Sequence, residues 1–97
     1  MKFLILLLVL SSFADRRLDY IGKHPELTRS VIEAVQRGEL VKGMPESAVI
    51  VVKGQPLERA VIQDYQGYDI IIFGYRDQYL FLVQEGRSLV LIDWRKR

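Results

Sequence analysis

The chain has 97 residues, a formal net charge of +2, a single histidine and no cysteine. That length allows one small domain at most. A charge balance so close to neutral argues against nucleic acid as the main partner, because phosphate backbones are bound by strongly basic surfaces. Without cysteine no disulfide can form, so packing alone must hold the fold.

The first fourteen residues have the pattern of a secretory signal peptide. Lys2 is followed by the unbroken apolar run 3–10, and Ser12 and Ala14 occupy the minus-three and minus-one positions of a cleavage site. We therefore expect residues 1–14 to be removed as a cleaved signal peptide. Loss of Lys2 changes the net charge from +2 to +1.

The same segment predicts where the protein works. Its apolar run is much shorter than the ~20 residues that a membrane-spanning helix needs, which disfavours the alternative of an uncleaved anchor. No cysteine follows the small residues, so a lipid anchor is not expected. The prediction is an exported protein, periplasmic in location and soluble rather than lipid-anchored.

After a polar lead-in at residues 15–24, the next segment has the pattern of an amphipathic helix. Pro25 suits a first helical turn, where its missing N–H would have no partner, and Glu26 places negative charge at the positive end of the helix dipole. Apolar residues recur at spacings of three and four up to Gly38, the expected C-terminal stop. They are Leu27, Val31, Ala34 and Val35.

The run 48–52, with sequence AVIVV, is ambiguous on local evidence. Its β-branched residues favour a strand. Its flanks favour a helix, because Pro45 and Glu46 make a good first turn, Gly54 is placed as a stop and Pro56 prevents continuation. The residues alone leave the two readings nearly even.

From residue 60 onward, short apolar runs alternate with turn residues. We predict strands at 60–65, 68–75, 79–85 and 88–94, and connections this short make an antiparallel meander. A tight hairpin at Gly86-Arg87 pairs Val83 with Val90, Phe81 with Ile92 and Tyr79 with Trp94 on one face, to which the preceding turn adds Ile71 and Phe73. The other face carries Ile70, Ile72, Leu80, Leu82, Leu89 and Leu91.

Both faces of this predicted sheet are apolar, whereas a sheet with one solvated face alternates with polar residues. Two short helices can cover only one face. We expect the other to be closed in part by a protein partner, by a second copy in a homodimer, or by the lead-in residues 18–21. A self-sufficient monomer is the alternative. The candidate interaction face is the leucine face, with Leu80, Leu82, Leu89 and Leu91.

Signals for catalysis or metal binding are weak. His24 is the only histidine and precedes Pro25 at a helix entrance, where a surface or capping role is expected. Asp64 and Asp69 could face each other across the turn 66–67, yet near a hairpin end such carboxylates are usually solvated charges. No cluster of His, Cys or carboxylates has metal-ligand spacing. We predict a non-enzymatic protein without cofactor or metal.

A family pattern resolves the ambiguous run. Gly43-Met44, Val49 and Gly54-x-Pro56 resemble the segment "G-M-T-x-x-x-V, then G-x-P" of the SmpA/OmlA domain, the family of the outer-membrane assembly lipoprotein BamE. Residues 24–38 and 79–94 are also similar to that domain, so the resemblance spans about residues 20–94. It implies that the run is the second of two helices and that Gly-x-Pro leads into an antiparallel sheet.

The resemblance implies an α+β fold, with two N-terminal helices packed on an antiparallel β-meander of three to four strands in two layers. The BamE-like domain would cover residues 25–94, followed by a basic tail at 95–97. It implies an envelope protein that acts through protein–protein contacts, with outer-membrane assembly subunits and anionic phospholipid as partners. The five matched residues can serve in turns, packing and helix termination, and no binding residue carries over.

Two departures from the family pattern limit these implications. Pro45 stands where the family has Thr, and the lipid-bearing Cys is missing. A secreted inhibitor or peptide-binding module on the same scaffold is the alternative function. The basic residues Arg16-Arg17 and those of the tail could support weak contact with anionic lipid, and solvated terminal charges are the alternative there.

Overall fold

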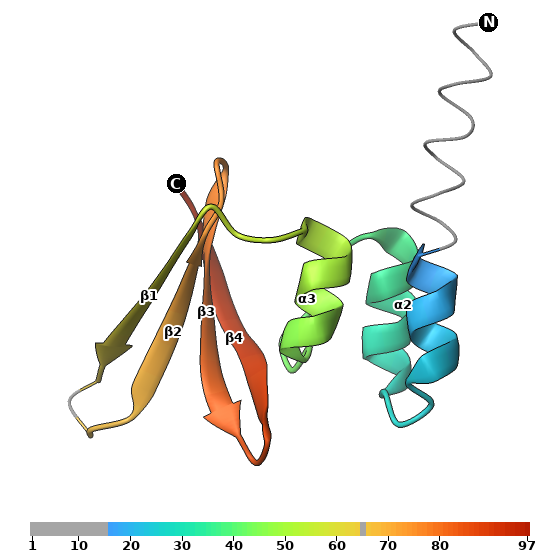
Figure 1. Cartoon of the computed structure of the whole chain (residues 1–97), viewed down its shortest axis with the longest axis horizontal. Helices are drawn as coiled ribbons and strands as arrows, with labels where there is room; N and C mark the ends of the chain where they lie inside the picture. Colours follow the sequence, from blue (N-terminus) through green and yellow to red (C-terminus); the bar gives the residue numbers. More distant parts are fainter. Residues whose placement is uncertain (1–15, 65) are drawn as a thin grey trace, which may run out of the picture.

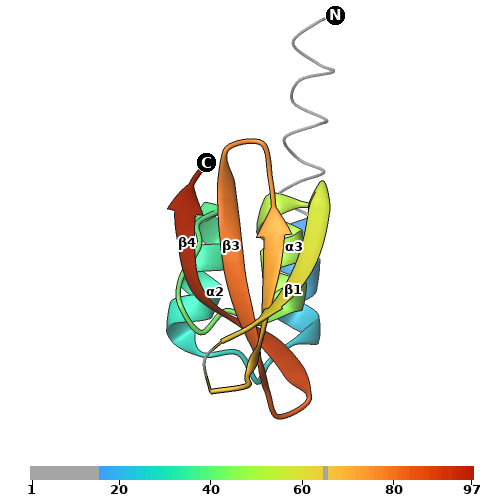
Figure 2. The same ribbon diagram turned by 90° about the vertical axis from the view of Figure 1, so that its left-hand side faces the viewer.

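The computed structural model describes residues 16–64 and 66–97. The expected signal peptide, residues 1–14, lies outside this part of the chain. One helix covers residues 16–23, and the other elements follow in chain order: α2 (Arg29–Arg37), α3 (Glu46–Lys53), β1 (Glu58–Gln63), β2 (Asp69–Gly74), β3 (Gln78–Glu85) and β4 (Ser88–Lys96). The strands form one antiparallel sheet in the order β1-β2-β3-β4, with the helices behind one face (Figures 1 and 2). The predicted α+β architecture is confirmed.

A helix at residues 16–23 replaces the expected polar lead-in. Its buried side chain is Tyr20, whose hydroxyl shares a 2.8 Å hydrogen bond with Ser47 Oγ of α3. The helix therefore packs on the helical layer, beside α2 and away from the sheet (Figure 1). The expectation that residues 18–21 fold over the second sheet face is wrong.

Helix α2 ends as predicted but begins later. Thr28 is the N-cap residue, and its hydroxyl accepts a hydrogen bond from the amide of Val31 at 3.4 Å. Pro25 and Glu26 instead form a turn after the first helix. At the other end Gly38 has φ 69°, a left-handed conformation that glycine adopts without strain. The amphipathic pattern is confirmed, because α2 buries Val31, Ala34 and Val35.

The ambiguous run forms helix α3. Pro45 is its N-cap residue, with no side-chain hydrogen bond, and Gly54 ends it with φ 80°. The helix lies between the sheet and the other two helices (Figure 1), so apolar residues are needed on most of its sides. Ala48 and Val49 are fully buried, and residues 50–52 are partly buried against the core. Burial on two sides thus outweighs the strand propensity of the β-branched run.

The turn between β2 and β3 changes the predicted faces. Gly74 pairs with Tyr79, and the amide of Tyr75 donates to the carbonyl of Gln78 at 2.9 Å. Phe73 therefore pairs with Leu80, one residue away from the predicted register. A shift of one residue moves every side chain of a strand to the opposite face. Ile71 and Phe73 join the leucine face, and Ile70 and Ile72 join Phe81 and Val83.

A β-bulge between β3 and β4 changes the far end of the last hairpin. Val83 pairs with Val90 as predicted, but the register shifts at Phe81/Leu82. Phe81 then pairs with Asp93 and Leu80 with Trp94, so Ile92 is the extra residue. The predicted pairs Phe81–Ile92 and Tyr79–Trp94 are wrong. Trp94 packs against the core on the helix side of the sheet. β4 also continues to Lys96, into the expected basic tail.

Candidate interaction surface

The leucine face of the sheet forms the sheet side of the hydrophobic core. Leu80, Leu82 and Leu91 are fully buried, and Leu89 is partly buried against them. These leucines lie on the side that the helices cover, so the candidate interaction face expected from the sequence is not at the surface. Both faces of the strands are apolar, and the sequence holds no local signal for which one the helices take.

The opposite side of the sheet carries apolar side chains, and none of the helices at residues 16–23, 29–37 and 46–53 covers it. Figure 2 looks directly onto it, with all the helices behind the strands. We call it the outer face. Ile62 and Ile92 are the most exposed of its large side chains, with 47% and 39% of their surfaces accessible. By strand register and exposure it comprises Ile62, Ile70, Ile72, Phe81, Val83 and Ile92.

A shallow hollow marks the part of the outer face over β3 and β4. Its apolar lining is Ile70, Phe81 and Ile92, and its polar lining is Asp93 and Arg95. The hollow measures about 310 Å³. The bulge at Ile92 places the two charged residues here. Without it, Trp94 would pair with Tyr79 on the outer face, in the position that Arg95 now takes. An apolar centre with a charged rim is the usual composition of a protein–protein interface.

The matched family residues occupy packing and turn positions. Met44 and Val49 are fully buried, and Gly43 and Gly54 have φ values of 91° and 80°. The amide of Gly43 donates to the carbonyl of Leu91, and the amide of Leu91 donates to the carbonyl of Met44, both at 2.8 Å. The motif therefore joins the start of α3 to the edge of β4. Pro56 follows in the connection to β1.

The titratable residues considered for catalysis form no common site, and Asp69 lies opposite Gln63, not Asp64, in the strand register. His24 hydrogen-bonds Glu26 at 2.9 Å and lies 4.4 Å from the ring of Tyr20, next to the first helix. A backbone hydrogen bond and then the His24 contact hold the pKa of Glu26 below its ordinary value. Asp64 caps the β1–β2 turn by accepting from the amide of Tyr68 at 2.9 Å. This turn and the segment of His24 lie at opposite ends of the long axis in Figure 1.

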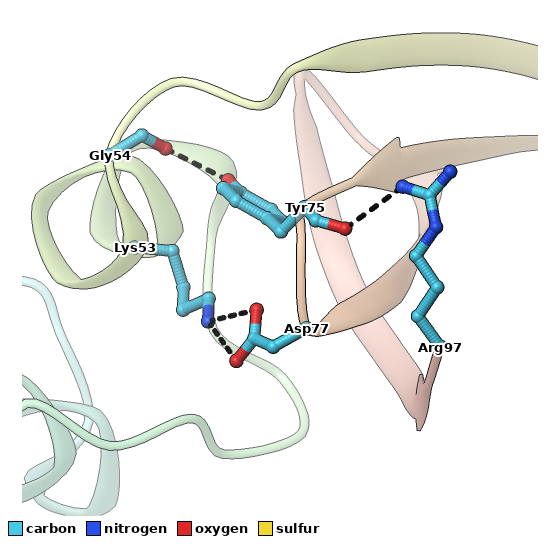
Figure 3. Close-up of polar contacts among 5 residues, drawn as sticks. All are labelled: Lys53, Gly54, Tyr75, Asp77 and Arg97. Atoms are coloured by element: carbon cyan, nitrogen blue, oxygen red, sulfur yellow. Dashed lines mark hydrogen bonds and ion pairs between the residues drawn. The ribbon is translucent and has the colours of Figure 1, made fainter.

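A polar network at the other end of the sheet was not foreseen from the sequence. The Tyr75 hydroxyl donates to the carbonyl of Gly54 at 2.8 Å, and Lys53 Nζ lies 3.2 Å from both carboxylate oxygens of Asp77 (Figure 3). Arg97 Nη1 donates to the carbonyl of Tyr75 at 3.1 Å. These contacts join the end of α3, the β2–β3 turn and the end of β4. The network connects three elements, so its evident effect is on stability.

Burial raises the pKa of Tyr75 to about 12 from the ordinary value of 10. Between these two pH values the unfolded chain releases the phenolic proton while the folded chain keeps it. The free energy of unfolding is therefore expected to fall as the pH rises from 10 to about 12. Below pH 10 this contribution is fully present.

The variant Tyr75→Phe tests this assignment. Near neutral pH it should lower the free energy of unfolding by about 1 kcal/mol, because the hydrogen bond to Gly54 is lost. The difference from the wild type should shrink as the pH rises from 10 towards 12, and urea unfolding at both ends of that range measures it. Tyr68→Phe, at an exposed position, is the control near neutral pH. A difference that stays constant with pH would contradict the burial of this phenol.

Comparison with protein-family models, curated proteins and solved structures found no match to this chain. Across residues 16–64 and 66–97, no group of three or more His, Cys, Asp or Glu side chains is placed to hold a metal ion. In that same part of the chain no helix combines the length and the apolar composition that a membrane span requires.

Proposed function

We propose that the chain is an exported, non-enzymatic protein of the cell envelope, similar to the BamE-like assembly factors, which acts through protein–protein contacts. The outer face is the observation that carries the proposal. Isolated apolar side chains are common on protein surfaces, but a contiguous apolar face over several strands is typical of an interaction site. The signal-like N-terminus and the Gly-Met and Gly-x-Pro motif support the location and the family.

Phe81 and its neighbours are suited to anchor a partner. Phe81 lies on β3, one of the two central strands, opposite Ile72, and lines the hollow together with Ile92. Full burial of a side chain such as Phe or Ile contributes roughly 1.5–3 kcal/mol. Binding energy concentrates in apolar anchors of this kind, near the centre of an interface. Asp93 and Arg95 at the rim would set orientation and specificity more than affinity.

The basic residues near the two ends of the described chain support a second, weaker contact with anionic phospholipid. In Figure 1 the C terminus lies in the upper part of the sheet side, and the start of the first helix lies in the upper part of the helix side. Arg16 and Arg17 belong to the first of these segments, and Arg95 and Lys96 to the second. Each cationic side chain near an anionic surface contributes about 1 kcal/mol, so adsorption through them would be weak and sensitive to salt.

Site-specific photo-crosslinking in the protein's own source tests the proposal. A photoreactive amino acid at Ile92 samples the outer face, and the matched control is Leu18, equally apolar and 61% exposed on the first helix. We expect position 92, and not position 18, to capture envelope proteins of outer-membrane assembly, identified by mass spectrometry. Adding Asp93→Arg or replacing Phe81 by Asp should reduce that capture by at least ~10-fold, since both alter the hollow.

The other outcomes separate the alternatives. Capture of one exported enzyme, without membrane proteins, would favour the secreted inhibitor or peptide-binding module on the same scaffold. Equal capture from both positions, or none from position 92, would contradict a partner on the outer face.

A further inference from the structure

Strand β1 forms an open edge of the sheet. Among residues 16–64 and 66–97 its one strand partner is β2, and all six of its residues are exposed. Large apolar side chains gather along and beside it: Val61 is 60% exposed on the helix side of the sheet, and Ile62 is 47% exposed on the outer face. Leu57 and Tyr68, at its two ends, are exposed as well. An exposed edge strand that is apolar on both faces can pair with a strand of another chain, because its outward N–H and C=O groups are free to bond it.

The opposite edge of the sheet is protected. Residues 43–45 lie along β4, where the amide of Leu91 bonds to Met44 and Pro45 forms a bridge with Val90. Beyond them β4 ends in Arg95 and Lys96, and charged residues and proline are the usual means of blocking an edge. β1 has no proline, and its pairing with β2 is regular throughout, with Ala-Val-Ile at its centre.

The backbone groups on the open edge follow from the pairing with β2. The amide of Asp64 donates to the carbonyl of Tyr68, and hydrogen-bonded pairs alternate along an antiparallel ladder. Residues 58, 60 and 62 therefore direct their N–H and C=O groups towards β2. Those of Arg59, Val61 and Gln63 point away from the sheet, where a further strand can bond them.

We propose that this edge binds a second copy of the chain, with the two β1 strands antiparallel and Val61 opposite Val61 across a two-fold axis. A two-fold interface must be self-complementary, and β1 meets this requirement because each copy supplies an apolar residue to each side of the pair. Ala60 of one copy lies opposite Ile62 of the other on the outer face. The sheets then join into one, and the two outer faces become continuous.

The polar and charged residues at the ends of β1 also meet in this register. Arg59 of one copy falls opposite Gln63 of the other, and Gln63 Nε2 donates to Asp69 Oδ1 at 3.3 Å. The second copy thus presents a carboxylate on the side of the sheet where Arg59 lies. Glu58 of one copy falls opposite Asp64 of the other, which places two carboxylates near each other at each end of the paired strands. Each has a partner in its own chain, because Glu58 Oε1 lies 3.0 Å from Arg97 Nη2 and Asp64 Oδ1 accepts from the amides of Gln66 and Tyr68. Arg59 already has a carboxylate partner in its own chain, Glu46 at 3.3 Å, so the preference for a second copy comes from the matching apolar residues on both sides of the pair.

The size of the contact sets its strength. Six residues of strand span ~20 Å, which places the interface at the small end of specific protein contacts. We expect a dimer with a dissociation constant on the order of tens of micromolar. This pairing is independent of the partner proposed for the outer face.

Replacing Val61 by residues of opposite charge tests the register. The sample is the protein purified in the form that the expressing cells produce. Sedimentation equilibrium should show that it exchanges between monomer and dimer. V61K and V61E, at a 60% exposed position, should each fold normally but lower the association constant by at least ~10-fold, because like charges then face each other. An equimolar mixture of the two should restore dimer formation. Leu18→Lys is the control and should dimerise like the wild type.

Two results would overturn the proposal. One is a wild-type protein that stays monomeric at ~0.5 mM, well above the expected dissociation constant. The other is a dimer that V61K and V61E leave unchanged. Ile92→Asp separates this inference from the proposed function, since it should disturb the outer face without weakening the dimer.

Discussion

Replacing Phe73 by alanine is expected to lower the free energy of unfolding by about 3–5 kcal/mol. Phe73 is fully buried on the helix side of β2, in contact range of the core that the helices and β3 form. Removing the ring costs its transfer free energy and leaves a cavity between two layers that can close only in part. In a domain this small, a loss of that size is a large share of the total stability.

The matched control is Phe81→Ala, on the neighbouring strand. Phe81 pairs with Ile72 and is partly exposed on the outer face, so its loss should cost less than ~1.5 kcal/mol. Urea unfolding measures the free energy of unfolding of both variants, and the two values can be compared if the dependence on urea concentration is the same. If Phe81→Ala were the more costly, the helices would have to cover the other face of the sheet.

Much of the fold follows from local signals in the sequence. Gly38 and Gly54 end helices as predicted, and each of the four predicted strands overlaps an observed one. These features depend on turn residues and on the period of apolar positions, which act over a few residues. The helix at residues 16–23 was not foreseen, because its main anchor is tertiary: the contact of Tyr20 with Ser47, a residue distant in the chain.

The faces of the sheet could not be derived in the same way. Two single-residue features decide them, the turn at Tyr75 and the extra residue Ile92. Each moves a run of side chains to the other side of the sheet, and neither has a distinctive residue pattern in a strand that is apolar throughout. The sequence thus predicted an uncovered apolar face and assigned it to the leucines, which the structure places in the core.

Met44 lies where the core meets the protected edge of the sheet, beside β4. Its side chain is fully buried, and its carbonyl accepts the amide of Leu91 at 2.8 Å, so one residue contributes both to the core and to the protection of β4. Met44→Ala is expected to lower the free energy of unfolding by about 2–5 kcal/mol. Met44→Leu, which conserves volume, should cost less than ~1.5 kcal/mol.

Hydrogen exchange shows whether Met44 also protects the edge. In Met44→Ala the amide of Leu91 should exchange faster relative to the amides of the β2–β3 ladder, because residues 43–45 are no longer anchored by the buried side chain. Phe73→Ala is the control for general destabilisation, since it should accelerate exchange across the sheet without singling out Leu91. An unchanged ratio in Met44→Ala would mean that backbone hydrogen bonds alone hold the segment on β4, and that the side chain serves only the core.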